Sequence, residues 1–201
     1  RILVQKSAFD TFMEHFEVAV KKFRVEDPNL ATADMGPLIS KKQFDVVESF
    51  LDEPVAFKGS APSGPGYWMP PTVLLPKNTQ SRSWREEIFG PVLSIVRVKS
   101  YDEGVALING GAFGNGTAIF TNDGGAARRF QNEVEVGMIG INVPIPVPVA
   151  YYSFGGWKNS LFGDTKAHGM EGVHFFTRGK AITSRWLDPS HGGINLGFPQ
   201  N

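Results

Sequence analysis

The sequence contains no cysteine. Disulfide bonds, thiolate metal sites and a cysteine nucleophile are therefore excluded within these 201 residues. Net charge is lacking too, because 20 basic and 20 acidic side chains cancel, and the composition gives no electrostatic reason to expect nucleic acid or an anionic membrane surface as a partner. No run of about 18 apolar residues occurs, so we expect no segment to span a bilayer. No spacing of His, Asp and Glu predicts a metal site.

The chain also starts without an initiator methionine or a signal peptide. Residues 1–5, Arg-Ile-Leu-Val-Gln, resemble the middle of an apolar strand instead. We therefore expect the chain to be a fragment of a longer protein, and we expect that protein to be cytoplasmic.

The elements that the sequence predicts are those of an α/β protein. Helices are expected after Ser7, after Ser40, after Ser100 and after Asp123, each with a capping residue at its start. Strands and helices alternate over residues 92–143, a pattern that predicts parallel strands joined by crossovers. The sequence thus predicts a twisted, mostly parallel sheet with helices on both faces.

The last part of the chain has a different character. Prolines at every second position from 144 to 148 exclude a central strand there and predict a rigid, extended loop. A strand is expected over 174–186, with Phe176, Ile182 and Trp186 giving it an apolar surface. An unpaired apolar strand invites pairing with another chain, so we expect a homo-oligomer formed through 174–186. The expected division is 1–172 for the main domain, 173–187 for this strand and 188–201 for an irregular tail.

Residues 86–91, Glu-Glu-Ile-Phe-Gly-Pro, are the most informative stretch. We expect a helical turn that ends at Gly-Pro and leads into a buried strand, which delivers its last side chains to a sheet edge where α/β folds bind ligands. The hexapeptide resembles a signature of the aldehyde dehydrogenase superfamily. The resemblance implies that Glu87 holds the nicotinamide ribose of NAD and that Phe89 touches the nicotinamide ring. The alternative is a helix end with solvated acids and one core phenylalanine.

Other blocks resemble the same family in order and spacing, namely residues 34–39, 67–74 and 113–186. By this resemblance the chain is the C-terminal part of the catalytic domain, and the cysteine nucleophile lies outside it. No catalytic residue is then expected within this chain, which alone should be inactive. The turn at 34–39 precedes the helix that carries Gln43, the polar residue that the resemblance places near the cofactor ribose. Its alternative is an ordinary surface glutamine.

From about residue 87 onward the sequence resembles the methylmalonate-semialdehyde dehydrogenase branch of the family. The resemblance implies an NAD-dependent oxidative decarboxylation of methylmalonate or malonate semialdehyde, with coenzyme A as co-substrate, to propionyl-CoA or acetyl-CoA. Phe154 is expected to line the substrate pocket, because aromatic residues of loops near clefts often do, and its alternative is a structural role. Hydrolytic members generally carry Gly-Arg-Glu where this chain has Thr165-Lys166-Ala167. Without that carboxylate to assist water, an acyl-enzyme can wait for a thiol.

Two further hypotheses stay open at this point. One is a hydrolytic aldehyde dehydrogenase, which would release a free acid instead of an acyl-CoA. The other is a non-catalytic chain that keeps the oligomerisation strand and binds no small molecule.

Overall fold

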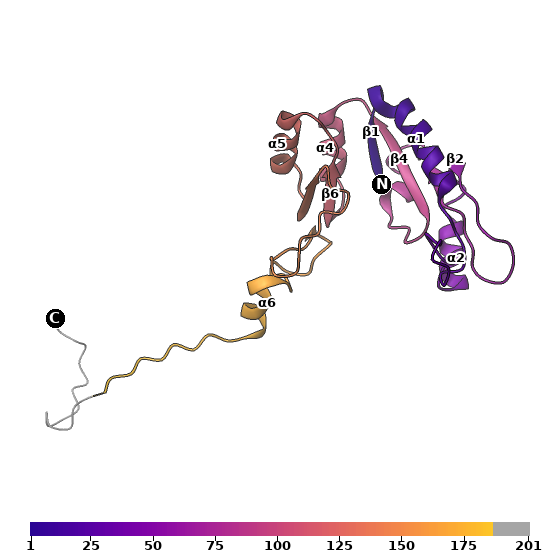
Figure 1. Ribbon diagram of the computed structural model, residues 1–201. Helices are drawn as coiled ribbons and strands as arrows, with labels where there is room; N and C mark the ends of the chain where they lie inside the picture. Colours follow the sequence, from indigo (N-terminus) through magenta and orange to yellow (C-terminus); the bar gives the residue numbers. More distant parts are fainter. Residues whose placement is uncertain (187–201) are drawn as a thin grey trace, which may run out of the picture.

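The computed structural model describes residues 1–186, which form two groups of elements and an extended segment (Figure 1). The first group is built on a four-stranded sheet of order β1-β4-β3-β2. Strands β1 (Ile2–Gln5) and β3 (Thr72–Leu74) both run parallel to the central strand β4 (Val92–Val98). Strand β2 (Val55–Lys58) is antiparallel to β3, so the sheet is mixed.

Helices cover this sheet. A short 3-10 turn (Lys6–Ala8) leads into α1 (Phe9–Lys22), and α2 (Lys41–Glu48) and the one-turn helix α3 (Arg82–Arg85) follow. The side chain of Ser40 accepts a hydrogen bond from the backbone of Gln43, which confirms the predicted cap of α2.

The two faces of the sheet carry separate cores. Neighbouring residues of a strand point to opposite faces, so Val73 packs against the α1 side and Leu74 against the α2 side. Val20 of α1 joins the first core, and Val47 of α2 joins the second. The predicted arrangement, with helices on both faces of a mostly parallel sheet, is confirmed here.

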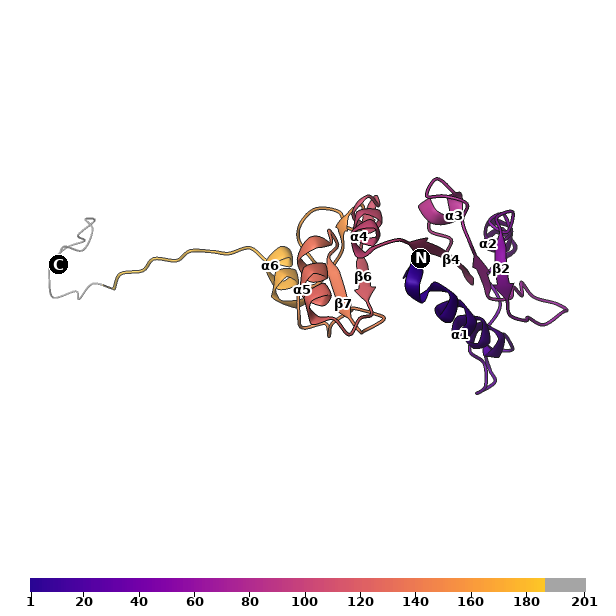
Figure 2. The ribbon, with the colours of Figure 1, turned by 90° about the horizontal axis from the view of Figure 1, so that it is seen from above.

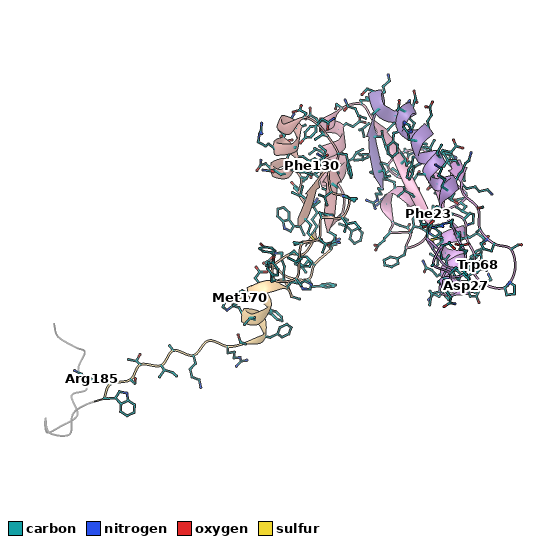
Figure 3. The ribbon with its side chains drawn as sticks, in the orientation of Figure 1. Phe23, Asp27, Trp68, Phe130, Met170 and Arg185 are labelled. Atoms are coloured by element: carbon teal, nitrogen blue, oxygen red, sulfur yellow. The ribbon has the colours of Figure 1, made fainter. Side chains whose placement is uncertain are left out.

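The second group lies beyond β4 and contains one strand–helix–strand unit (Figure 2). Helix α4 (Tyr101–Asn109) comes first, and then β6 (Gly116–Ile119) and β7 (Met138–Ile141) pair in parallel across α5 (Gly124–Glu133). Phe130 of α5 lies at the centre of this core (Figure 3), which is completed by Val134, Val136 and partly buried side chains of α4, β6 and β7.

The expected continuity between the two groups is wrong in one respect. Strands β4 and β6 belong to different sheets, although a helix joins them as predicted. A second small ladder, β5 (Phe113–Gly114) with β8 (Trp157–Lys158), pairs antiparallel and was not predicted. Sequence alternation indicates that strands exist, but it does not determine which strands pair.

The strand expected over 174–186 is not formed within the single chain. Helix α6 (Gly169–Phe176) contains residues 174–176, and residues 177–186 have no regular secondary structure and project away from both groups, as the position of Arg185 shows (Figure 3). A strand forms only where a neighbouring strand supplies the other half of its ladder hydrogen bonds. Pairing with a second chain therefore stays a prediction. Residue 187 and the predicted tail 188–201 lie outside the described residues.

Within residues 1–186, no helix is both long and apolar enough to cross a bilayer.

Candidate functional site

The hexapeptide 86–91 lies between α3 and β4. The helical turn expected over its first residues ends earlier, because α3 stops at Arg85 and the backbone of Glu86 is extended. The following residues therefore form a loop that leads into β4, the central strand of the sheet. This loop, residues 86–91, is called the β4 entry loop below.

The two acids of the β4 entry loop are in different environments. Glu86 accepts hydrogen bonds from Arg82, with Nε to Oε1 at 3.1 Å, and this contact lowers the pKa of Glu86. Within the described part of the chain, no hydrogen bond or ion pair engages the exposed Glu87 carboxylate. The guanidinium of Arg1 has a pKa lowered by its burial, and the negative charge of Glu87 acts on it in the opposite direction. Glu87 is thus available as a hydrogen-bond acceptor.

Phe89 is presented to solvent and is not a core residue. Its side chain is 78% exposed, and its backbone φ is 55°. A left-handed backbone is unfavourable for a bulky residue by about 1–3 kcal/mol, so the surrounding contacts must hold it. The alternative in which this phenylalanine belongs to the core is therefore wrong.

Helix α2 supplies the contacts that hold the loop. Gln43 donates a hydrogen bond from Nε2 to the carbonyl oxygen of Phe89 at 2.9 Å and approaches that of Ile88 at 3.4 Å. Ile88 is buried in the core on the α2 side. A Cβ added at Gly90 would lie only 2.6 Å from Cγ2 of the fully buried Val47. The backbone of the loop is thus fixed on both sides of Phe89.

The structure therefore brings Gln43 and Phe89 together, with Glu87 two residues away along the loop. Gln43 is not an ordinary surface residue, because it joins α2 to the loop. Its contact with a cofactor ribose stays a prediction. Sequence reasoning missed the role of Gly90, although a glycine next to a proline after a buried isoleucine is a signal of close backbone approach.

We expect Gln43→Ala to loosen the β4 entry loop without unfolding the protein. Losing one neutral hydrogen bond costs about 1 kcal/mol, which corresponds to a roughly five-fold faster amide exchange at residues 88–90. Hydrogen-exchange mass spectrometry measures this effect. The matched control is Lys42→Ala at an exposed position of the same helix. Equal exchange in the two variants would show that Gln43 does not hold the loop.

Phe154 lies in a second loop, between β7 and β8, and within residues 1–186 no ring contact joins it to Phe89. This loop, residues 142–156, is called the Phe154 loop below. The ring of Phe154 stacks on the imidazole of His168, with centroids 4.4 Å apart and planes 5° from parallel. The preceding residue, Ser153, donates a hydrogen bond from Oγ to Oε2 of Glu171 at 2.6 Å. Neither His168 nor Glu171 was expected to contact the loop from sequence alone.

Among residues 1–186, no group of three His, Asp or Glu side chains could hold a metal ion. The two loops present an acceptor carboxylate, Glu87, and the aromatic rings of Phe89 and Phe154.

The sequence profile described as the aldehyde dehydrogenase family matches residues 1–182. A malonate-semialdehyde dehydrogenase of Pseudomonas aeruginosa is 42% identical over 98% of this chain and 42% of its own length. A malonate-semialdehyde dehydrogenase of Geobacillus thermodenitrificans is 47% identical over 64% of this chain and 27% of its own length. The chain thus spans less than half the length of the curated relatives that it matches.

Solved structures give the same result. The crystal structure of methylmalonate-semialdehyde dehydrogenase from Oceanimonas doudoroffii matches with a TM-score of 0.86 and 36% identity, over 93% of this chain and 41% of that one. Betaine aldehyde dehydrogenase from Staphylococcus aureus, in complex with NAD+, matches with a TM-score of 0.79 and 32% identity, over 88% of this chain and 36% of that one. In sequence and in structure, the chain belongs to the aldehyde dehydrogenase family.

Proposed function

We propose that this chain supplies the nicotinamide side of the active site of an NAD-dependent aldehyde dehydrogenase. The observation that carries the proposal is the β4 entry loop, which presents an unengaged carboxylate, Glu87, and an exposed ring, Phe89, from a backbone fixed by α2. A carboxylate can accept hydrogen bonds from two ribose hydroxyls, and an aromatic ring can cover a flat heterocycle. These residues therefore fit the nicotinamide riboside half of NAD.

In this proposal each residue has a binding or orienting role. Glu87 fixes the ribose, and Phe89 borders the ring and excludes water from one of its faces. Gln43 holds the carbonyl of Phe89 and lies close enough to the loop to add a contact to the ribose. When bound, NAD accepts the hydride that leaves the aldehyde carbon. The catalytic thiol must come from a segment outside these 201 residues, which contain no cysteine.

The substrate that we propose is methylmalonate or malonate semialdehyde, with Phe154 lining its pocket. The support is the identity of 42% to a malonate-semialdehyde dehydrogenase over nearly the whole chain. The product that we propose is an acyl-CoA: the thiolate of coenzyme A attacks the acyl-enzyme carbonyl, and the cysteine thiolate leaves.

The surroundings of the loop that carries Phe154 support transfer of the acyl group to a thiol instead of to water. Ala167 stands where hydrolytic members carry a glutamate. The nearest carboxylate on α6, Glu171, is engaged, because its Oε2 accepts hydrogen bonds from Ser153 Oγ and from the backbone nitrogen of Lys166 at 3.1 Å. These two donors lower the pKa of Glu171, and a weaker base assists water less well.

Product analysis of the complete enzyme tests this proposal. With malonate semialdehyde, NAD and coenzyme A, acetyl-CoA and carbon dioxide should form in proportion to NADH, because the carboxylate carbon of the substrate leaves as carbon dioxide. Free acetate as the main product would favour the hydrolytic alternative, and an absence of NADH formation with any aldehyde would leave the non-catalytic one.

The 201-residue chain by itself should form no acyl-CoA, because the nucleophile is missing. Removing a nucleophile that acts as part of a unit abolishes nearly all of the chemical step, typically several orders of magnitude in rate. Mixing the purified chain with NAD, coenzyme A and semialdehyde, and following NADH absorbance, checks this. Robust turnover by the chain alone would contradict the assignment.

Assembly into a homo-oligomer through 174–186 belongs to the same proposal. Phe176 is 76% exposed and Trp186 is 93% exposed, and the backbone of residues 177–186 belongs to no strand. A second copy that adds a strand here would satisfy these backbone groups and cover the two rings. A protein that ends after Thr177 should then form smaller oligomers, which light scattering at micromolar concentration measures as fewer subunits per particle. An unchanged number of subunits would contradict this interface.

A further inference from the structure

The loop that carries Phe154 is closed by contacts from the first turn of α6. Glu171 of α6 accepts a hydrogen bond from Ser153 Oγ at 2.6 Å, and the same oxygen accepts from the backbone nitrogen of Lys166 at 3.1 Å. One carboxylate oxygen therefore joins two segments that are 13 residues apart. Hydrogen bonds to a charged acceptor are about twice as strong as those between neutral groups.

Phe154 is held directly beside this junction. Its ring stacks on His168, the residue that precedes α6, at 4.4 Å between centroids. The backbone nitrogen of Gly169 donates to the carbonyl oxygen of Ala150 at 3.1 Å, on the other side of the loop. The start of α6 thus contacts the loop before Phe154, at Ser153, and at the ring itself.

The other side of the loop rests on the second group of elements. A Cβ added at Gly137, just before β7, would lie 1.8 Å from the carbonyl oxygen of Gly155. The loop is therefore in direct contact with backbone on one side and with α6 on the other. Among these contacts, the two hydrogen bonds to the Glu171 carboxylate join separate segments and are both lost when this one side chain is removed.

We propose that Glu171 is a positioning residue, which fixes Phe154 for the aldehyde by joining Ser153 to Lys166. The inference rests on the proposed function, in which Phe154 lines the substrate pocket. Glu171 touches neither substrate nor cofactor in this scheme. It acts through Ser153, the neighbour of Phe154, and through the adjoining stack with His168.

The ionised state of Glu171 agrees with this role. Its pKa is lowered, first by the hydrogen bond from Ser153 and next by that from Lys166, so the charged acceptor is the form that these donors favour. A glutamate in the first turn of a helix is also favourable for the helix dipole. A helix-capping role alone would, however, leave the position of Phe154 unaffected, and this difference can be measured.

The experiment uses the complete enzyme with Glu171→Ala and, from the other side of the junction, Ser153→Ala. Asp164→Asn is the matched control, because Asp164 lies in the same exposed segment as Lys166, between β8 and α6. Within residues 1–186 its carboxylate accepts no hydrogen bond. Hydrogen exchange over residues 153–158 should become about ten-fold faster in both test variants and stay unchanged in the control. The KM for semialdehyde should rise about ten-fold, with kcat and the KM for NAD within about two-fold of wild type.

Each outcome decides one question. Unchanged exchange in Glu171→Ala, or faster exchange with an unchanged KM for semialdehyde, would overturn the positioning role. A larger fall in kcat than rise in KM would overturn it too, because that result indicates a contact made in the transition state. Failure of the proposed function looks different: the wild-type enzyme would then oxidise no aldehyde, whatever the exchange experiment shows.

Discussion

Replacing Glu87 by glutamine in the complete enzyme is expected to slow hydride transfer by about 10- to 100-fold. The carboxylate is exposed and accepts no hydrogen bond within residues 1–186, so its full acceptor capacity is available to the ribose. An amide keeps one acceptor oxygen and loses the charge. A charge-assisted hydrogen bond contributes about 1.5–3 kcal/mol, and each 1.4 kcal/mol changes a rate ten-fold. Poor fixation of the ribose leaves the nicotinamide ring badly oriented for the hydride.

The chain contains a matched control for this experiment in the adjacent residue. Glu86→Gln makes the same chemical change one position earlier, but it removes a pair with Arg82 that faces solvent. Exposed pairs contribute little, so this variant should transfer hydride at the wild-type rate. Single-turnover NADH formation is the measurement, and light scattering and thiol alkylation check that assembly and the reactive cysteine are intact. If both variants were equally fast, the functional role of Glu87 would be disproved.

Gly137→Ala is expected to have the largest effect on stability. The added Cβ would meet three backbone atoms of the Phe154 loop, at 1.8 Å, 2.8 Å and 2.9 Å, and backbone cannot rotate out of the way as a flexible side chain can. Overpacking of this kind costs about 1–3 kcal/mol. We therefore expect a lower thermal midpoint for the complete enzyme and a higher KM for semialdehyde, because the loop has to move.

Gly124→Ala provides the comparison. This glycine is the first residue of α5, and an added Cβ would have only one ordinary contact, at 3.7 Å from a nitrogen of Arg128. Alanine is the better helix former, so this variant should be neutral or slightly more stable. If the thermal midpoint of Gly137→Ala equals that of Gly124→Ala, then the Phe154 loop does not pack against Gly137.

The local features of the fold were predictable from sequence because their causes lie within a few residues. Ser40 and Ser100 accept hydrogen bonds from the residues three positions on, and Asp123 caps α5 in the same way. These are interactions of neighbours, and the residue types that make them are characteristic. Strands β1, β4, β6 and β7 were predicted for a similar reason, from runs of apolar and β-branched residues.

The features that sequence did not predict depend on distant partners. Strand β2 is only four residues long and mostly exposed, and pairing with β3 is what forms it. Residues 173–176 are rich in β-formers, yet the contacts of Gly169 and Glu171 with the Phe154 loop favour a helix there. In the candidate site, Glu87 and Phe89 were predicted by resemblance, and their contacts with a cofactor stay a prediction. The anchoring of their loop by Gln43 and Val47 depends on packing between residues more than 40 positions apart.

The left-handed backbone of Phe89 has a consequence for how this position can change over generations. Glycine or asparagine adopts a φ of 55° more easily than phenylalanine, so either residue at this position should make the fold more stable. The same replacement would remove the exposed ring. Selection for a stable chain and selection for a working one thus act in opposite directions at a single residue. In the proposed function, the phenylalanine is explained by its exposed ring and not by its fit to the fold.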